Sequence, residues 1–170
     1  MTELPHPDNF HLRAAEGWML LGDTISALEE LVKLRPASRE EPGALRLEWQ
    51  ILAIMGDWTK AYAAAEQLVS KSPELADAWV HRAYAARRMK GGGLDRAWEA
   101  LYPAVEKFPS ESIIPYNLAC YAAQMSRLDE AWTWLERAAQ ASKDKKAIWL
   151  MAMADSDLEP IRERIAGKAR

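Results

Sequence analysis

Cys120 carries the strongest nucleophile that the sequence offers, and it is the only cysteine among 170 residues. A reactive thiol needs a neighbouring base or positive charge that lowers its pKa. The sequence shows no evident activating base for Cys120, which predicts a packed or groove-lining thiol. A single cysteine also leaves no internal disulfide and no cluster of thiolate metal ligands, and it fits a reducing compartment.

Two other groups of residues have the spacing of a binding site. The glycine run Gly91 to Gly93 suggests a phosphate loop, but no strand precedes it and no Gly-Lys-Ser/Thr sequence follows, so it predicts a flexible helix connection. Asp155, Asp157 and Glu159 are spaced like calcium ligands. Pro160 stands where a calcium loop needs glycine, which favours a cluster of charges at the start of a helix.

The histidines give no better case for a metal or catalytic site. His6, His11 and His81 are scattered along the chain, with no acidic or thiol partner at the spacing of metal ligands. We therefore expect no catalytic residue, no metal and no cofactor, and we predict that the protein is not an enzyme.

Charge and hydropathy narrow the class of partner. A formal net charge of -3 and a pI near 5.7 give no broad positive field, which argues against nucleic-acid binding. The N-terminal sequence MTELPHPDNF lacks the basic and apolar regions of a signal peptide. No window approaches the roughly 18 consecutive apolar residues of a membrane-spanning helix, so we expect a cytoplasmic protein that does not associate with membranes.

The elements that would position these residues repeat along the chain. Ala27 and Ala61 are 34 residues apart, the interval lengthens to 36 before Ala97, and it returns to 34 before Ala131. The longer interval contains the turn MKGGGLD, which carries the extra residues in a loop. Apolar residues recur at helical spacing on either side of each short turn, and strand-like alternation is absent, so the fold is predicted to be all-α.

The repeating alanine marks a place where two helices cross too closely for a larger side chain. In the same register Trp49 shares a column with Ala15, Ala83 and Ala119. The ring of Trp49 is therefore predicted to be accommodated by small neighbours and to be largely buried.

The pattern predicts four helix-turn-helix repeats in a single domain over residues 1–170. The repeats are expected near 9–41, 42–74, 75–110 and 111–143, followed by a C-terminal capping helix pair within 144–166. Their helices are expected near 9–21, 24–35, 42–55, 58–71, 75–89, 94–107, 112–124 and 128–141, and the cap helices near 144–153 and 157–166. One repeat cannot bury both of its faces alone, so the array must be continuous and capped.

The interval, the Gly-Asp turns at Gly22 and Gly56, the alanine column and the prolines Pro73 and Pro109 together resemble the tetratricopeptide repeat. The resemblance covers about residues 9 to 141, and YNLACYAAQMSRLDEAWTWLERA matches best. Ser126 departs from the pattern, because glycine is common at that turn. The tail DSDLEPIRERI resembles a segment that often follows such repeats in bacterial proteins. The resemblance implies a right-handed α-solenoid.

The resemblance also implies that the first helix of each repeat lines a concave groove that holds a peptide or segment of another protein. Transferred column by column, the groove residues are Arg46, Gln50, His81, Tyr84, Arg87, Arg88, Tyr116 and Asn117, accompanied by Leu12, Arg13, Glu16, Val80, Cys120 and Gln124. The arginines and His81 would make this groove locally positive, which predicts an acidic or carboxylate-bearing partner. The predicted function is a non-enzymatic protein-binding scaffold.

Two alternatives stay open on the sequence. One is a structural module that self-associates end to end or through an exposed aromatic face. The other is an adaptor similar to the tetratricopeptide-repeat chaperones of secretion systems. Some repeats clamp a C-terminal carboxylate with a lysine and two asparagines, but Leu12 and Glu16 stand where two of these are expected. The oligomeric state and the identity of the partner are not encoded in the residues.

Overall fold

A computed structural model describes residues 4–168, and it divides the chain into two compact units, residues 1–91 and 92–170. The first unit holds α1 (Asp8–Leu20), α2 (Thr24–Val32), α3 (Pro36–Arg39), α4 (Pro42–Met55), α5 (Trp58–Lys71) and α6 (Ala76–Arg88). The second holds α7 (Leu94–Leu101), α8 (Ala104–Lys107), α9 (Ile113–Gln124), α10 (Leu128–Ala141), α11 (Lys145–Ala154), the 3-10 helix η1 (Ser156–Ile161) and α12 (Arg162–Ala166). No strand occurs between residues 4 and 168, which confirms the all-α prediction.

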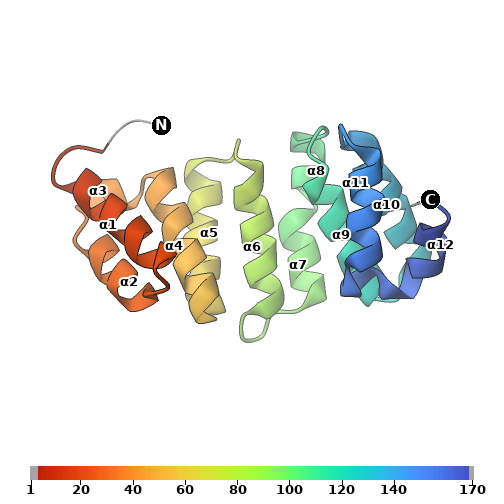
Figure 1. The fold of residues 1–170 in the computed structure, drawn as a ribbon, viewed down its shortest axis with the longest axis horizontal. Helices are drawn as coiled ribbons and strands as arrows, with labels where there is room; N and C mark the ends of the chain where they lie inside the picture. The colour runs from red at the N-terminus through yellow and green to blue at the C-terminus, as the bar shows by residue number, and fades with distance from the viewer. Residues whose placement is uncertain (1–3, 169–170) are drawn as a thin grey trace. The chain divides into compact units, whose positions relative to one another are not determined.

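Helices of the first unit pack side by side in chain order (Figure 1). α1 lies against α2, α2 against α4, and α5 lies between α4 and α6. One buried cluster joins α1, α2 and α4 through Ala15, Leu31 and Ile51. The helix pairs have the bounds expected from the sequence to within a few residues, except that α2 ends at Val32 and the short α3 follows it.

The turns of this unit explain the repeated Gly-Asp sequence. Gly22 and Gly56 have φ values of +82° and +74°, a left-handed conformation that glycine adopts without strain. Asp23 and Asp57 then cap the next helix, because each carboxylate accepts a hydrogen bond from the backbone N–H three residues on. At the corresponding turn of the second unit Ser126 takes the same left-handed conformation, with φ +61°.

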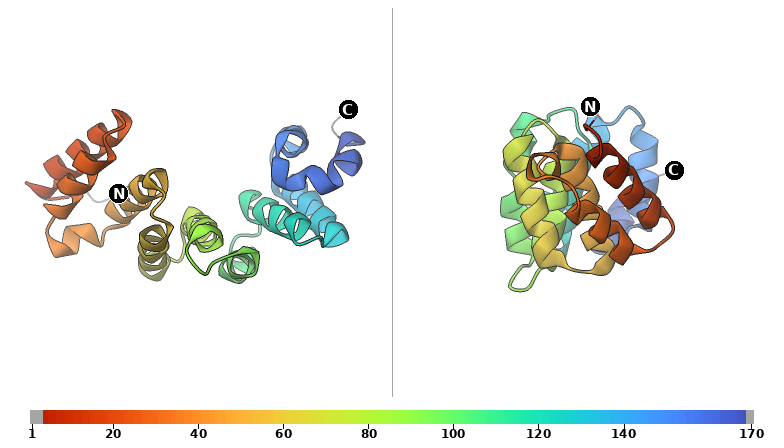
Figure 2. Two further views of the ribbon diagram at one scale, coloured as in Figure 1. Left: turned by 90° about the horizontal axis from the view of Figure 1, so that it is seen from below. Right: turned by 90° about the vertical axis from the view of Figure 1, so that its left-hand side faces the viewer.

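The second unit is built on the pair α9 and α10, with α11, η1 and α12 packed on it (Figure 2). α11 contacts α10 and α12, and η1 lies against α9. The prediction of a single helix over 94–107 is wrong, because the helix is interrupted at Pro103, between α7 and α8. Proline lacks the N–H that a helix interior needs and collides with the preceding turn. The cap consists of α11, η1 and α12 in place of two simple helices.

The boundary between the two units divides one of the predicted repeats. The third repeat, expected over 75–110, supplies α6 to the first unit and α7 to the second. The single domain over 1–170 therefore stays a prediction of the sequence.

The alanine column has the packing role that the sequence predicts. Ala27, Ala61, Ala97 and Ala131 are all 0% exposed. Since protein interiors are close-packed, these sites leave no room for added methylene groups.

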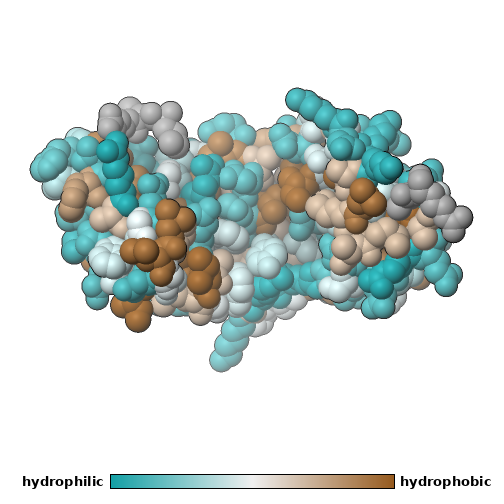
Figure 3. Space-filling model, in the orientation of Figure 1, coloured by the Kyte–Doolittle hydropathy of each residue, from teal (hydrophilic) through white to brown (hydrophobic). Residues whose placement is uncertain are grey.

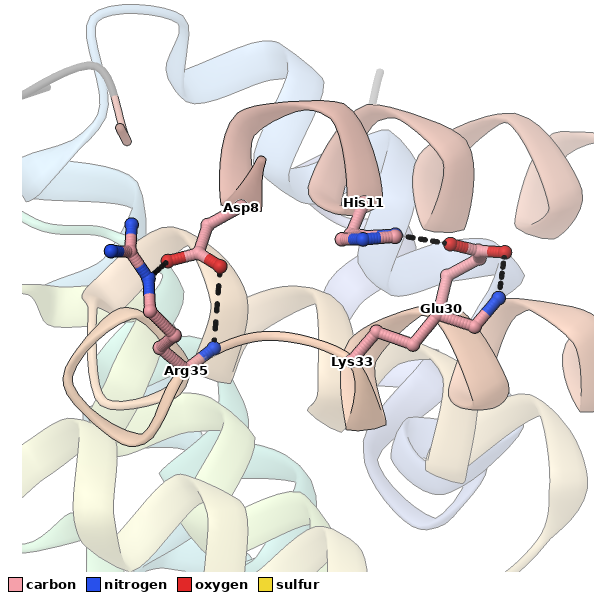
Figure 4. Close-up of polar contacts among 5 residues, drawn as sticks. All are labelled: Asp8, His11, Glu30, Lys33 and Arg35. Atoms are coloured by element: carbon pink, nitrogen blue, oxygen red, sulfur yellow. Dashed lines mark hydrogen bonds and ion pairs between the residues drawn. The ribbon is translucent and has the colours of Figure 1, made fainter. Parts of the chain in front are cut away.

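A buried carboxylate ties the start of α1 to the segment after α2 (Figure 4). Asp8 is 0% exposed, and its carboxylate accepts hydrogen bonds from Arg35 Nε at 2.7 Å and from the backbone N–H of Arg35 at 3.3 Å. The hydroxyl of Ser38 donates a further hydrogen bond to it. These hydrogen bonds, that from Ser38 above all, hold the pKa of Asp8 below its ordinary value, although burial acts in the opposite direction.

A second polar link joins the first turn of α1 to the last turn of α2. The Glu30 carboxylate on α2 lies 2.8 Å from His11 Nδ1 on α1 and 2.6 Å from Lys33 Nζ (Figure 4). Together the two links fix α1 against α2 and the segment that follows it.

Replacing Ala61 by leucine tests the close crossing at the alanine column. We expect Ala61→Leu to lower the free energy of unfolding by about 1–3 kcal/mol, because the larger side chain overpacks the contact. Urea denaturation measures the change. Ala63 is exposed on the same helix, so Ala63→Leu is the matched control and should stay within about 0.5 kcal/mol of the wild type. Equal effects of the two substitutions would contradict this register.

Asp8 predicts a specific dependence of stability on pH. Because its folded pKa lies below the ordinary value, the ionised form stabilises the fold above about pH 4, and this contribution is lost as pH falls through the folded pKa. Asp8→Asn should therefore lower the melting temperature most at neutral pH, and its difference from the wild type should shrink on acidification. A difference that stays constant down to about pH 3 would argue against an ionised, hydrogen-bonded Asp8.

Candidate functional site

A pocket of about 540 Å³ opens in the first unit between α1, the start of α4 and the segment that leads into α6. Its wall combines apolar side chains, carboxylates and guanidinium groups. The lining residues are Leu4, Asn9, Leu12, Arg13, Glu16, Glu41, Pro42, Gly43, Ala44, Arg46, Ser72, Glu74 and Leu75. Four of the predicted groove positions, Leu12, Arg13, Glu16 and Arg46, are among them.

Helical periodicity explains why these residues share one wall. Leu12 and Glu16 are one turn apart on α1, and Pro42 and Arg46 are one turn apart on α4. Pro42 begins α4 without a missing hydrogen bond, since the first turn of a helix has no acceptor for its N–H. Gly43 then leaves space, because a Cβ placed there would meet no atom within 4 Å.

Arg46, at the edge of the pocket, already has a partner within the protein. Its Nε lies 2.7 Å from Asp77 Oδ2 on α6. The Nε–H does not point along this line, so the contact is an ion pair without an aligned hydrogen bond. The positive charge that the sequence assigns to Arg46 is thus largely compensated by Asp77.

His81 does not contribute positive charge at neutral pH. Burial lowers its pKa below the ordinary 6.5, and the nearby Arg46 acts in the same direction, while Asp77 opposes them. Its imidazole stacks on Trp49, with ring centroids 3.8 Å apart and an interplanar angle of 12°. Trp49 is only partly buried, against the prediction; its ring lies on His81 of α6 and packs on a buried cluster that includes Ala61, Ala64 and Ala85.

An aromatic cluster with an arginine on its surface extends from this stack. Tyr84 packs edge-on against Trp49 at 6.3 Å and lies 5.7 Å from Trp58. The guanidinium of Arg88 lies 3.4 Å from the centre of the Tyr84 ring and 5.4 Å from that of Trp58. Cation–π contacts hold Arg88 on this surface. Of the predicted groove residues, the first unit therefore brings Arg46, His81, Tyr84 and Arg88 together, with Gln50 and Arg87 on the same two helices.

In the second unit the chain itself covers the predicted groove residues. Tyr116 and Cys120 on α9 are each only 5% exposed. The Tyr116 hydroxyl donates a hydrogen bond to Asp155 at 3.0 Å, and Cys120 Sγ lies 3.6 Å from the same carboxylate oxygen. Gln124 Nε2 donates to the backbone oxygen of Asp157 at 2.9 Å. Tyr116, expected to offer contact area to a peptide, is buried where η1 begins.

Two more observations complete the second unit. Burial, with the charges of Cys120 and Asp155 adding to it, raises the pKa of Tyr116 far above its ordinary range, so the phenol stays protonated. Asn117 is partly exposed, but its Nδ2 donates to the carbonyl of Ile113 one turn earlier in the helix. Tyr116 is thus held inside the unit, and Asn117 uses one amide N–H within its own helix.

Cys120, Asp155 and Asp157 come together although the sequence gives no hint that they meet. One potential ligand atom from each lies within 4.8 Å of the others. The carboxylate of Asp155 is already used by Tyr116, by Cys120 and by the backbone N–H of Asp157 at 2.9 Å. The cluster is fully explained as the contact that attaches the cap to α9.

Similarity to solved structures identifies the fold. MamA, residues 41 to the end, from Desulfovibrio magneticus RS-1 superposes with a TM-score of 0.70 over 97% of this chain and 94% of its own, at 15% identity. TTC0263, a thermophilic TPR protein of Thermus thermophilus, gives 0.62 over 94% and 97% of the two chains, at 19% identity. The chain has the tetratricopeptide-repeat fold.

The tetratricopeptide-repeat assignment rests on structure and on the repeat pattern. No protein-family model matches the sequence, and no curated protein is significantly similar to it. A double mutant of MamA RS-1 gives a TM-score of 0.69 over 79% of this chain and 75% of that one, at 17% identity. Within residues 4–168, no helix combines the length and hydropathy required to cross a membrane.

His81 predicts a second pH effect, distinct from that of Asp8. Because its pKa is lowered in the fold, the unfolded chain binds the proton more readily, and stability should fall as pH drops below 6.5 and then level off once the folded form is protonated too. His81→Gln should remove this loss between about pH 7 and pH 5. NMR titration of the imidazole should give a midpoint below 6.5. A midpoint above that value would mean that Asp77 outweighs burial.

Proposed function

We propose that the protein is a non-enzymatic scaffold that binds a segment of another protein in the pocket of the first unit. The pocket volume of about 540 Å³ carries this proposal, because it lies in the range of specific binding sites and is bordered by predicted groove positions on α1 and α4. The proposed site comprises Leu12, Arg13, Glu16, Arg46 and Gln50, with His81, Tyr84, Arg87 and Arg88 on the neighbouring α6.

The wall of the pocket suits a peptide better than a small molecule with one charged group. Leu12, Pro42 and Leu75 offer apolar contact, whereas Asn9 offers an amide. The side-chain amide of Asn9 carries both a donor and an acceptor, the groups that pair with a peptide backbone. A peptide presents apolar side chains and backbone donors together.

A second candidate, self-association, has one observation in its favour. In the second unit Trp98, Tyr102 and Trp134 form a ring cluster with centroids 5.9 to 6.1 Å apart, and Tyr102 is 51% exposed. Aromatic residues on a surface are typical of interfaces. Light scattering decides between the two functions. A monomer that still binds a partner protein excludes self-association through this aromatic cluster. A dimer that Tyr102→Ser dissociates supports self-association.

Filling the pocket tests the proposed site. Gly43→Tyr should place a ring in the pocket without disturbing the fold, because its Cβ has open space and a side chain in place of glycine favours the helix. Proteins captured from a lysate of the source organism by the wild type should be lost or reduced at least fivefold with Gly43→Tyr. Pull-down and mass spectrometry measure the difference.

The matched control uses another helical glycine. Gly17 on α1 also has open space, since a Cβ placed there would meet no atom within 4 Å, and it does not line the pocket. Gly17→Tyr should keep every partner that the wild type captures. If Gly43→Tyr keeps them as well, with unchanged helicity and melting, the pocket is not the binding surface.

A further inference from the structure

We infer that the bound segment is basic and apolar, with a lysine or arginine at the pocket and an apolar side chain on the exposed surface beside it. The inference rests on the proposed function and names the chemistry of its partner. It differs from the acidic partner expected from the sequence, since Asp77 compensates the charge of Arg46 and His81 is neutral at neutral pH.

Uncompensated negative charge surrounds the pocket. Glu16, Glu41 and Glu74 are all exposed in its wall, and none has a hydrogen bond or ion pair from its side chain to another residue within 4–168. Of the two arginines in the wall, Arg46 is paired with Asp77 and Arg13 has an interaction of its own. A cationic side chain is therefore the group that this wall attracts.

An apolar surface lies at the ends of the two helices, α1 and α4, that line the pocket. We call Leu20, Leu21, Ile54 and Met55 the apolar rim; their exposed fractions are 83%, 78%, 65% and 45%. Figure 3 shows hydrophobic residues gathered on the first unit where α1 and α4 end. Exposed apolar side chains that cluster in this way mark interaction surfaces in soluble proteins.

Helical geometry places the pocket and the apolar rim in line. Leu20 follows Leu12 and Glu16 at four-residue steps on α1, and Ile54 follows Arg46 at two such steps on α4. Two turns of helix span about 11 Å. An extended segment would therefore carry its cation about three residues from its apolar anchor, and a helical segment about seven residues from it.

The charges beside the apolar rim argue against two other occupants. Asp23 follows the apolar rim directly in the turn after α1 and accepts hydrogen bonds only from the neutral Ser26, so anionic lipid head groups would be repelled there. Asp57, in the turn after α4, is paired with Lys60 at 2.8 Å and adds no such charge. A second copy would bring the carboxylates of two pockets toward each other. A basic segment is attracted by the pocket carboxylates and by Asp23.

Selection from a random library of 12-residue peptides displayed on phage tests the inference on the whole chain. Enriched sequences should contain Lys or Arg together with Leu, Ile, Met or Phe at one of the two spacings. The best of them, made as a fluorescent peptide, should bind about five- to tenfold more weakly to Glu16→Gln/Glu41→Gln/Glu74→Gln, because three exposed charge contacts are lost. Ile54→Ser should weaken binding as well.

A matched triple variant separates local charge from net charge. Glu29, Glu106 and Glu111 are exposed outside the pocket, and Glu29→Gln/Glu106→Gln/Glu111→Gln changes the net charge equally. It should bind the peptide like the wild type. Equal weakening by both triple variants would mean general attraction and would overturn the inference.

The remaining outcomes separate this inference from the proposed function. Enriched acidic peptides that Gly43→Tyr excludes would refute the basic partner but keep the pocket as the binding site. Peptides that bind Gly43→Tyr unchanged, or a library without enrichment, would refute both. A dimer in light scattering that Ile54→Ser dissociates would make the apolar rim a self-association surface and would also overturn the inference.

Discussion

The close crossing of neighbouring helices at the alanine column determines most of what the two units present to a partner. Ala27, Ala61, Ala97 and Ala131 are fully buried. The helix that carries each of them must therefore turn this alanine toward its neighbour, which fixes the rotation of the helix about its own axis. That rotation decides which side chains of α1 and α4 point inward and which line the pocket. A change in the crossing would move Glu16 and Arg46 away from the pocket wall, so the proposed binding surface depends on residues that are themselves buried.

Local patterns allowed much of the fold to be predicted. The interval between repeats follows from the alanines, and the turns follow from the chemistry of Gly56 and Asp57, a left-handed glycine and a helix cap in adjacent positions. The break at Pro103 was missed although its cause is local, since a helical pattern of apolar residues continues on both sides of it. The repeat pattern outweighed the proline in the prediction.

Repeat periodicity predicts the helix face of each candidate site residue but not its charge or its partners. A column of a repeat tells which residues share a face, so Leu12 and Arg46 could be placed beside the pocket. It does not tell that Asp77 pairs with Arg46, or that burial keeps His81 neutral. Such properties depend on contacts between different helices. The structural likeness to MamA and TTC0263, at 15% and 19% identity, extends to the fold and leaves this surface to be understood from its own residues.

The contact between η1 and α9 limits where a further repeat can be inserted into the chain. Tyr116, Cys120 and Gln124 make specific hydrogen-bonding contacts with Asp155 and Asp157. A repeat added directly after α10 would separate these partners and leave a buried phenol and thiol without them. Duplication of an earlier repeat leaves the contact intact, since both of its surfaces match those of its neighbours. Lengthening by gene duplication is therefore compatible with the interior of the array and incompatible with the junction between α10 and α11.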